Sequence, residues 1–160
     1  AGALVHVYRD GSIHLNHGGT EMGQGLYVKV AQVLADCFQI DLDKVKITAT
    51  TTGKVPNTSA TAASSGSDLN GMAAANAAEQ IKDRLVRFAM HKFNVPEDAI
   101  SFEPNCVMVG NQRYDWADFI DQAYLARVQL SAAGFYKTPG IHGGARRCAA
   151  RCGQIAQSGD

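Results

Sequence analysis

The pattern of the chain changes from strand to helix within one glycine-rich stretch, His17-Gly18-Gly19-Thr20-Glu21-Met22-Gly23-Gln24-Gly25. Glycine lacks a side chain and adopts positive φ angles readily, so a backbone this rich in glycine can approach a ligand closely. The helix that follows begins with amide groups outside the helical ladder and with the positive end of its dipole, which favour an anion such as phosphate. The spacing is neither that of a dinucleotide-binding fingerprint nor that of a P-loop. From the residues alone, a ligand-binding turn and a purely structural turn stay equally open.

The segments on either side of this stretch predict an α+β fold. Apolar and polar residues alternate around Asp10-Gly11, which predicts a leading β-hairpin over Leu4 to Asn16. Apolar residues then recur at helical spacing from Gln24 to Phe38, and a second, alanine-rich helix is predicted to begin near Ala63. Further strands are predicted at 45–50, 100–102, 106–109 and 128–136, and a third helix at 116–126 after a capping Asp115. Because these elements follow no β-α-β rhythm, we expect a mixed sheet of hairpins packed with two or three helices.

The composition argues against several classes of partner. Fifteen Lys and Arg residues balance fifteen Asp and Glu residues, so charge offers no support for binding nucleic acid or an anionic membrane. No apolar run approaches the roughly 20 residues that span a bilayer. Cys37 and Cys106 fall in a predicted helix and a predicted strand, where we expect them to be small buried apolar residues. Cys148-x3-Cys152 lacks the second pair or histidine partner of a zinc site, so we expect reduced thiols and a cytoplasmic protein.

A family resemblance rests on separate motifs in the same order. The glycine stretch from Gly18 to Gly25, followed by Val55-Pro56-Asn57-Thr58-Ser59-Ala60-Thr61-Ala62-Ala63-Ser64, resembles the molybdopterin-binding region of xanthine dehydrogenases. Two later segments are similar to the same family: Ser67-Asp68-Leu69-Asn70-Gly71 and Leu130-Ser131-Ala132-Ala133-Gly134-Phe135-Tyr136-Lys137-Thr138-Pro139. The resemblance predicts that residues 1–141 are part of a molybdopterin-binding domain. Residues 142–160 depart from the family and are predicted to be a truncated, out-of-frame or disordered tail.

The resemblance implies a cofactor site without the reacting side chains. It implies that Met22, Gly23 and Gln24 contact the pterin and its phosphate tail. The second cofactor loop matches Thr61, Ala62, Ala63, Ser64 and Ser65. Gly66 stands where relatives tend to carry serine. The family's glutamate general base, and the arginine and second glutamate that orient substrate, lie in other parts of the family sequence, so we predict no catalytic residue and no direct metal ligand here.

By the same resemblance, the chain is expected to be part of the large subunit of a xanthine dehydrogenase-like molybdenum hydroxylase. The expected substrate is a purine such as hypoxanthine or xanthine, or an aldehyde, and the chain is expected to be inactive alone. Iron–sulfur clusters and FAD are expected elsewhere in the full enzyme. The expected partners are the rest of the molybdenum subunit and the iron–sulfur and FAD subunit or domains. Two alternatives stay open: a standalone pterin- or nucleotide-binding module, and a structural domain that binds no ligand.

Other candidate positions have simpler explanations. Glu21 precedes a predicted helix, where a carboxylate more often pairs with the helix dipole than acts as a general base. His6 and His14 are expected on neighbouring strands of the hairpin, where two histidines are more often solvated than bound to metal. Trp116 is expected to anchor the core rather than to support a cofactor.

Overall fold

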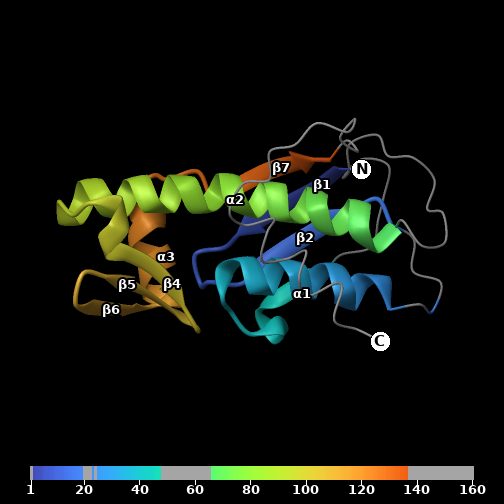
Figure 1. Cartoon of the computed structure of the whole chain (residues 1–160), viewed down its shortest axis with the longest axis horizontal. Helices are drawn as coiled ribbons and strands as arrows, with labels where there is room; N and C mark the ends of the chain where they lie inside the picture. Colours follow the sequence, from blue (N-terminus) through green and yellow to red (C-terminus); the bar gives the residue numbers. More distant parts are fainter. Residues whose placement is uncertain (1, 20–22, 24, 48–65, 137–160) are drawn as a thin grey trace.

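The computed structural model of the chain describes residues 2–19, 23, 25–47 and 66–136 (Figure 1). Its elements are β1 (Gly2–Val7), β2 (Ile13–His17), α1 (Leu26–Phe38), β3 (Val45–Ile47), α2 (Gly66–Phe93), β4 (Ile100–Glu103), β5 (Cys106–Val109), β6 (Gln112–Asp115), α3 (Trp116–Leu125) and β7 (Ser131–Phe135). Short 3-10 turns, η1 (Leu42–Lys44) and η2 (Glu97–Ala99), precede β3 and β4. These elements form a four-stranded sheet in the order β3-β2-β1-β7 and a three-stranded sheet in the order β4-β5-β6. The predicted α+β class, with a mixed sheet and helices packed on it, is confirmed.

The predicted hairpin is present as β1 and β2, displaced by one or two residues from the predicted bounds. Val5 lies opposite Leu15 in the antiparallel register. Gly11 takes a φ of 87° in the turn, and Asp10 Oδ1 accepts hydrogen bonds from the Ser12 amide at 3.0 Å and from its hydroxyl at 2.6 Å. β3 adds parallel to β2, and β7 adds antiparallel to β1, which makes the sheet mixed.

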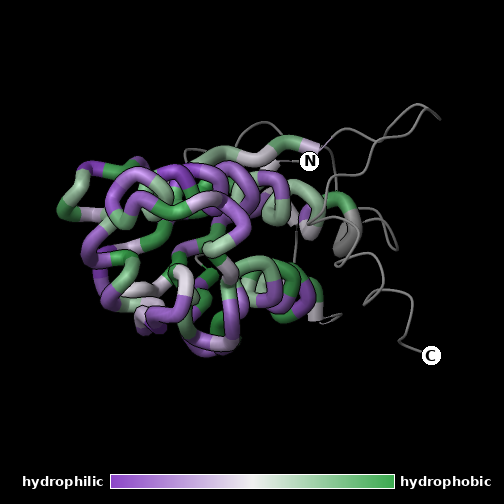
Figure 2. The backbone as a smooth tube through the Cα atoms, turned by 60° about the vertical axis from the view of Figure 1, so that its left-hand side comes forward, coloured by the Kyte–Doolittle hydropathy of each residue, from purple (hydrophilic) through white to green (hydrophobic). Residues whose placement is uncertain are grey.

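Alternation gives this sheet one buried face. Its buried members are Ala3, Val5 and Val7 of β1 and Ile13, Leu15 and His17 of β2. Helices α1 and α2 lie side by side over that face (Figure 1). Figure 2 shows apolar and hydrophilic positions alternating along the helices, as expected of elements that bury one side.

Helix α2 approaches the sheet with no large side chain between the two backbones. Ala73 and Ala77 of α2 are fully buried, and they lie opposite Gly134 of the edge strand β7. A Cβ atom at Gly134 would overlap the Ala73 carbonyl oxygen and would lie 2.7 Å from the Ala77 nitrogen. The helix backbone therefore rests directly on the strand.

Polar side chains of α2 also cover the outer edge of β7. Arg84 Nη1 donates to the Ser131 carbonyl at 2.7 Å and to the Gln129 carbonyl at 3.2 Å. Gln80 Nε2 donates to the Ala133 carbonyl at 3.1 Å. These bonds satisfy carbonyl groups that an edge strand leaves unpaired and hold the helix in register along the strand.

The second sheet joins the first through Trp116 at the start of α3. The Trp116 Nε1 group donates to the Gly11 carbonyl at 2.8 Å, and its ring lies 5.3 Å from that of Phe38. Trp116 is buried, so its predicted role as a core anchor is confirmed. Cys37 and Cys106 are likewise buried in a helix and a strand, as predicted.

Some boundaries differ from the sequence predictions. Strand β6 was not predicted, because Gln112–Asp115 is an exposed, largely polar edge strand without an apolar alternation. Helix α3 begins after Asp115 as predicted, but the Asp115 side chain makes no capping hydrogen bond. Helix α2 is described from Gly66 to Phe93, which agrees with a predicted start at about Ala63 or later.

The contact at Gly134 gives a direct test. Gly134→Ala should lower the free energy of unfolding by about 1 to 3 kcal/mol or more, because the new methyl group overlaps the backbone of α2. The matched control is Gly71→Ala, whose Cβ would lie at an ordinary 3.5 Å from Val33 Cγ2. That variant should gain up to about 1 kcal/mol of helix propensity. Equilibrium urea unfolding measures both, and equal stability of the two variants would contradict the close contact.

Candidate functional site

The described residues that flank both predicted cofactor loops meet at one end of the domain. Helix α1 follows the glycine stretch, and helix α2 follows the second predicted loop. The two helices run side by side, and both begin at the right-hand end of the view in Figure 1. Their positive dipole ends therefore share one side of the molecule, which is the arrangement that a ligand held by both loops requires.

Gly23 is the one predicted cofactor-binding residue that the structure describes. It is exposed, with a φ of 93°, and Gly25 at the N-cap of α1 has a φ of 76°. No described atom beyond the adjacent residues lies within 4 Å of a Cβ built at either glycine. Met22, Gln24 and the range 61–65 lie outside the described residues.

The start of α1 suits an anionic group. Gly25 provides no side-chain cap, and the first turn contains no acidic residue. The amide groups of that turn therefore face no competing carboxylate on the helix itself, which favours a phosphate. Glu21, which we expected to pair with the dipole, precedes Gly25 by four positions and lies outside the described residues. The described residues thus fit a phosphate-bearing pterin.

Two buried polar side chains lie at the base of the glycine stretch. His17 at the end of β2 is 1% exposed, and Asn70 in the first turns of α2 is 6% exposed. Between them lies Gly19, whose amide donates to His17 Nδ1 at 3.1 Å. Sequence reasoning did not single out this pair. The signal for His17 was its place in the alternation of β2, on the same face as Ile13 and Leu15.

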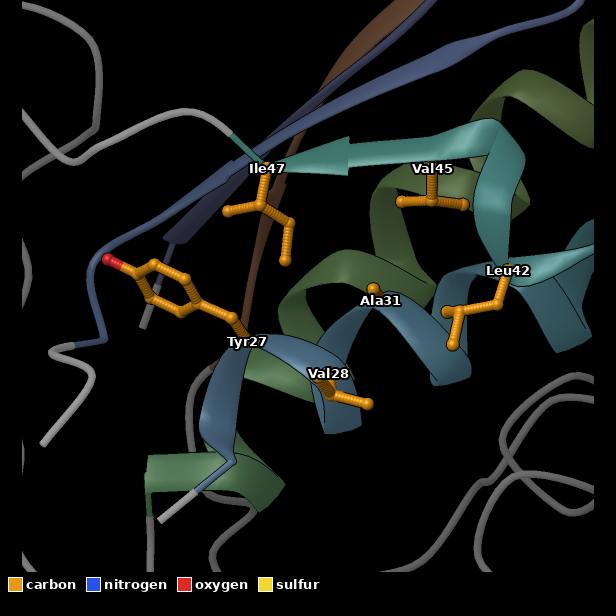
Figure 3. A pocket seen from close by; sticks show the side chains of 6 residues that line it. All are labelled: Tyr27, Val28, Ala31, Leu42, Val45 and Ile47. Carbon is orange, nitrogen blue, oxygen red and sulfur yellow. The ribbon is translucent and has the colours of Figure 1, made fainter. Parts of the chain in front are cut away.

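Two hollows on the described surface gather few charged side chains. One, of about 240 Å³, lies between α1 and β3, and Figure 3 shows its apolar lining, with Val45 and Ile47 pointing from β3 toward α1. A second, of about 290 Å³, lies between the end of β1 and the segment after α3. Arg9 and His6 are among the residues that line the second, but Arg9 is paired with Asp121, so neither hollow offers a cluster of charged groups for an anion or a metal.

The predicted histidine pair does face across the hairpin. His6 lies opposite His14 in the register, and both rings contact Tyr8, at centroid distances of 4.4 and 4.5 Å. Within the described part of the chain, no group of three or more His, Cys, Asp or Glu residues is arranged to hold a metal ion. None of the described helices combines the length and apolar character that a membrane crossing requires.

Three described residues have a shifted pKa: Arg9 and Asp10 on the hairpin turn, at the other end of β2 from Gly19, and Arg113 on β6. Hydrogen bonds from the Ser12 hydroxyl and amide lower the pKa of Asp10. The hydrogen bond to the Asp121 carboxylate raises the pKa of Arg9. These shifts are explained by turn and surface contacts, so they do not mark an active site.

Comparison with known proteins extends this description. The sequence matches the molybdopterin cofactor-binding domain family over residues 1–153. It is 45% identical over 141 residues to a xanthine dehydrogenase of Calliphora vicina and 48% identical over 141 residues to one of Blastobotrys adeninivorans. These matches cover 88% of the chain but 9% of each relative. The chain therefore spans about a tenth of the length of these relatives, and the predicted boundary at residue 141 stays a prediction.

Solved structures share the fold. A quinoline 2-oxidoreductase from Pseudomonas putida 86 superposes with a TM-score of 0.76 at 23% identity, over 85% of this chain and 19% of that one. A Cu,Mo-CO dehydrogenase superposes with a TM-score of 0.77 at 23% identity, over 86% of this chain and 18% of that one. The family match over nearly the whole chain carries the assignment, and the chain belongs to the molybdopterin cofactor-binding domain family.

Proposed function

We propose that this chain is part of the molybdenum-binding subunit of a xanthine dehydrogenase-like hydroxylase, and that it holds the cofactor without supplying the reacting side chains. The observation that carries the proposal is the shared end of α1 and α2, where the flanks of both predicted loops meet. The family match and the relatives named xanthine dehydrogenase support it.

In this proposal the first loop holds the anionic part of the cofactor. The positive-φ backbone at Gly23 and Gly25 and the positive end of the α1 dipole accept the phosphate tail, and Met22 and Gln24 contact the pterin. The second loop, with Thr61, Ala62, Ala63, Ser64 and Ser65, closes the site with hydroxyl groups and small side chains. When bound, the molybdenum cofactor supplies the oxygen-transfer and electron-accepting chemistry of hydroxylation.

The remaining parts of the enzyme lie outside this chain in the proposal. Relatives are about eleven times longer than the matched segment, since 141 residues cover 9% of them. We assign to that remainder the glutamate base, the groups that orient substrate, the iron–sulfur clusters and FAD. The proposed substrate is a purine such as xanthine, with an aldehyde as the other option, and the proposed location is the cytoplasm.

The first prediction is that the purified chain is inactive even with cofactor supplied. Proton transfer requires an acid or base within hydrogen-bond reach of the reacting atoms, and the proposal places those groups elsewhere. The measurement is turnover of xanthine and of an aldehyde by the purified chain. The full-length enzyme is the positive control, and a sample without protein is the negative control. Turnover above the protein-free sample would overturn the prediction. If the chain retains cofactor without turnover, and its source organism encodes no larger enzyme that contains it, the chain is a standalone binding module.

The second prediction concerns Gln24. In the full-length enzyme, Gln24→Ala should weaken cofactor retention by about 10- to 100-fold, because a hydrogen bond to a buried polar partner contributes on the order of 1 to 3 kcal/mol. Gln32→Ala on the exposed side of α1 is the matched control and should retain full molybdenum content. The measurements are molybdenum per subunit and the melting temperature. Normal metal content with a lowered melting temperature would show that Gln24 is structural.

A further inference from the structure

We propose that His17 and Asn70 are positioning residues that hold Gly19 between them and so fix the first cofactor loop to the helix that follows the second. The inference rests on the proposed function, in which one cofactor contacts both loops. It adds two buried residues, on β2 and α2, to the loop residues already assigned. Neither residue needs to touch the cofactor for this role.

The first contact is the hydrogen bond from the Gly19 amide to His17 Nδ1, at 3.1 Å. An accepting Nδ1 carries no proton, so the ring has its proton on Nε2. The ring of Tyr27, in the first turn of α1, packs edge-on against His17 with an interplanar angle of 86° and a centroid distance of 5.1 Å. The orientation of the acceptor is therefore set by the start of the helix that the loop leads into.

The second contact is steric. A Cβ atom at Gly19 would lie 2.6 Å from Leu26 Cδ2, 2.9 Å from Asn70 Nδ2 and 3.0 Å from His17 Nδ1. These atoms belong to α1, α2 and β2, so the backbone at Gly19 is enclosed by all three elements that surround the loop. A side chain at this position would therefore require the side chains of Leu26, Asn70 and His17 to shift.

The placement of Asn70 is not explained by helix packing. Asn70, Ala73, Ala77 and Ile81 follow one face of α2 at helical spacing, and all are buried. The other members are apolar, whereas asparagine has a lower helix propensity and requires polar partners when buried. It is the member of the face nearest the start of the helix, where its amide lies against Gly19. A polar residue at this place serves the loop rather than the core.

This arrangement couples the two loops. The first loop starts at Gly19, and the second ends where α2 begins, one turn before Asn70. A ligand that contacts both loops binds more tightly when their separation is fixed beforehand, because ordering them then costs less free energy. Loosening Gly19 should therefore reduce cofactor retention even where the core stays packed.

Two substitutions of His17 separate positioning from packing. His17→Phe keeps a buried ring against Tyr27 but removes the acceptor for the Gly19 amide. His17→Asn keeps an acceptor, since Asn Oδ1 lies the same number of bonds from the backbone as His Nδ1, but loses the ring. In the full-length enzyme we expect His17→Phe to reduce pterin and molybdenum retention about tenfold with a small change in melting temperature. We expect His17→Asn to melt at a lower temperature and to retain more cofactor than His17→Phe.

Leu85→Ala is the stability control, because Leu85 is buried in α2 beyond the alanine-rich segment. This variant should lower the melting temperature without loss of cofactor. Gly19→Ala and Asn70→Ala should match His17→Phe in cofactor loss. Hydrogen exchange of the peptide over residues 18–25 should be faster in all three.

If cofactor retention instead follows the melting temperature across the whole set of variants, the positioning role is wrong. If the unmodified enzyme contains no pterin at all, the proposed function fails, and that result is distinct from normal retention in His17→Phe.

Discussion

The backbone of α2 lies against the backbone of β7 at Gly134, and the arrangement of the domain depends on this contact. Close approach requires glycine on the strand and alanine on the helix, here Ala73 and Ala77. Arg84 and Gln80 then occupy the outer carbonyl groups of β7, which prevents the helix from sliding along the strand. Close packing and directed hydrogen bonds together fix the rotation of α2 about its axis and the position of its first turn relative to the sheet.

That defined starting point fixes the end of the domain at which we propose that the cofactor binds. Since α1 packs beside α2 in the same direction, both helices present their positive ends to one side. His17 and Asn70 converge there on Gly19, and Gly23 and Gly25 take positive φ angles. Recognition by backbone amides and small polar groups needs no excess of positive charge. The equal numbers of acidic and basic residues are consistent with such a site.

The opposite end of the domain is built for packing. Trp116 joins the second sheet to the hairpin turn through its hydrogen bond to Gly11, and its ring lies near those of Phe38 and Phe102. Asp10 and Arg9, whose pKa values are shifted by local hydrogen bonds, also lie on that turn. Aromatic packing therefore lies at one end of the domain, and the glycine residues of the proposed cofactor site lie at the other.

Local patterns were sufficient for the elements, because alternation and helical spacing are properties of neighbouring residues. They predicted the hairpin, α1, α2 and Trp116 as a core anchor, and they failed at β6, whose polar residues pair only through the neighbouring strand. The glycine motif and its resemblance identified the candidate cofactor loops without any structure. The pairing of His17 with Asn70 around Gly19, and the fit of Gly134 against Ala73, required the folded chain. These contacts join residues far apart in sequence, and their geometry exists only once α2 has packed on the sheet.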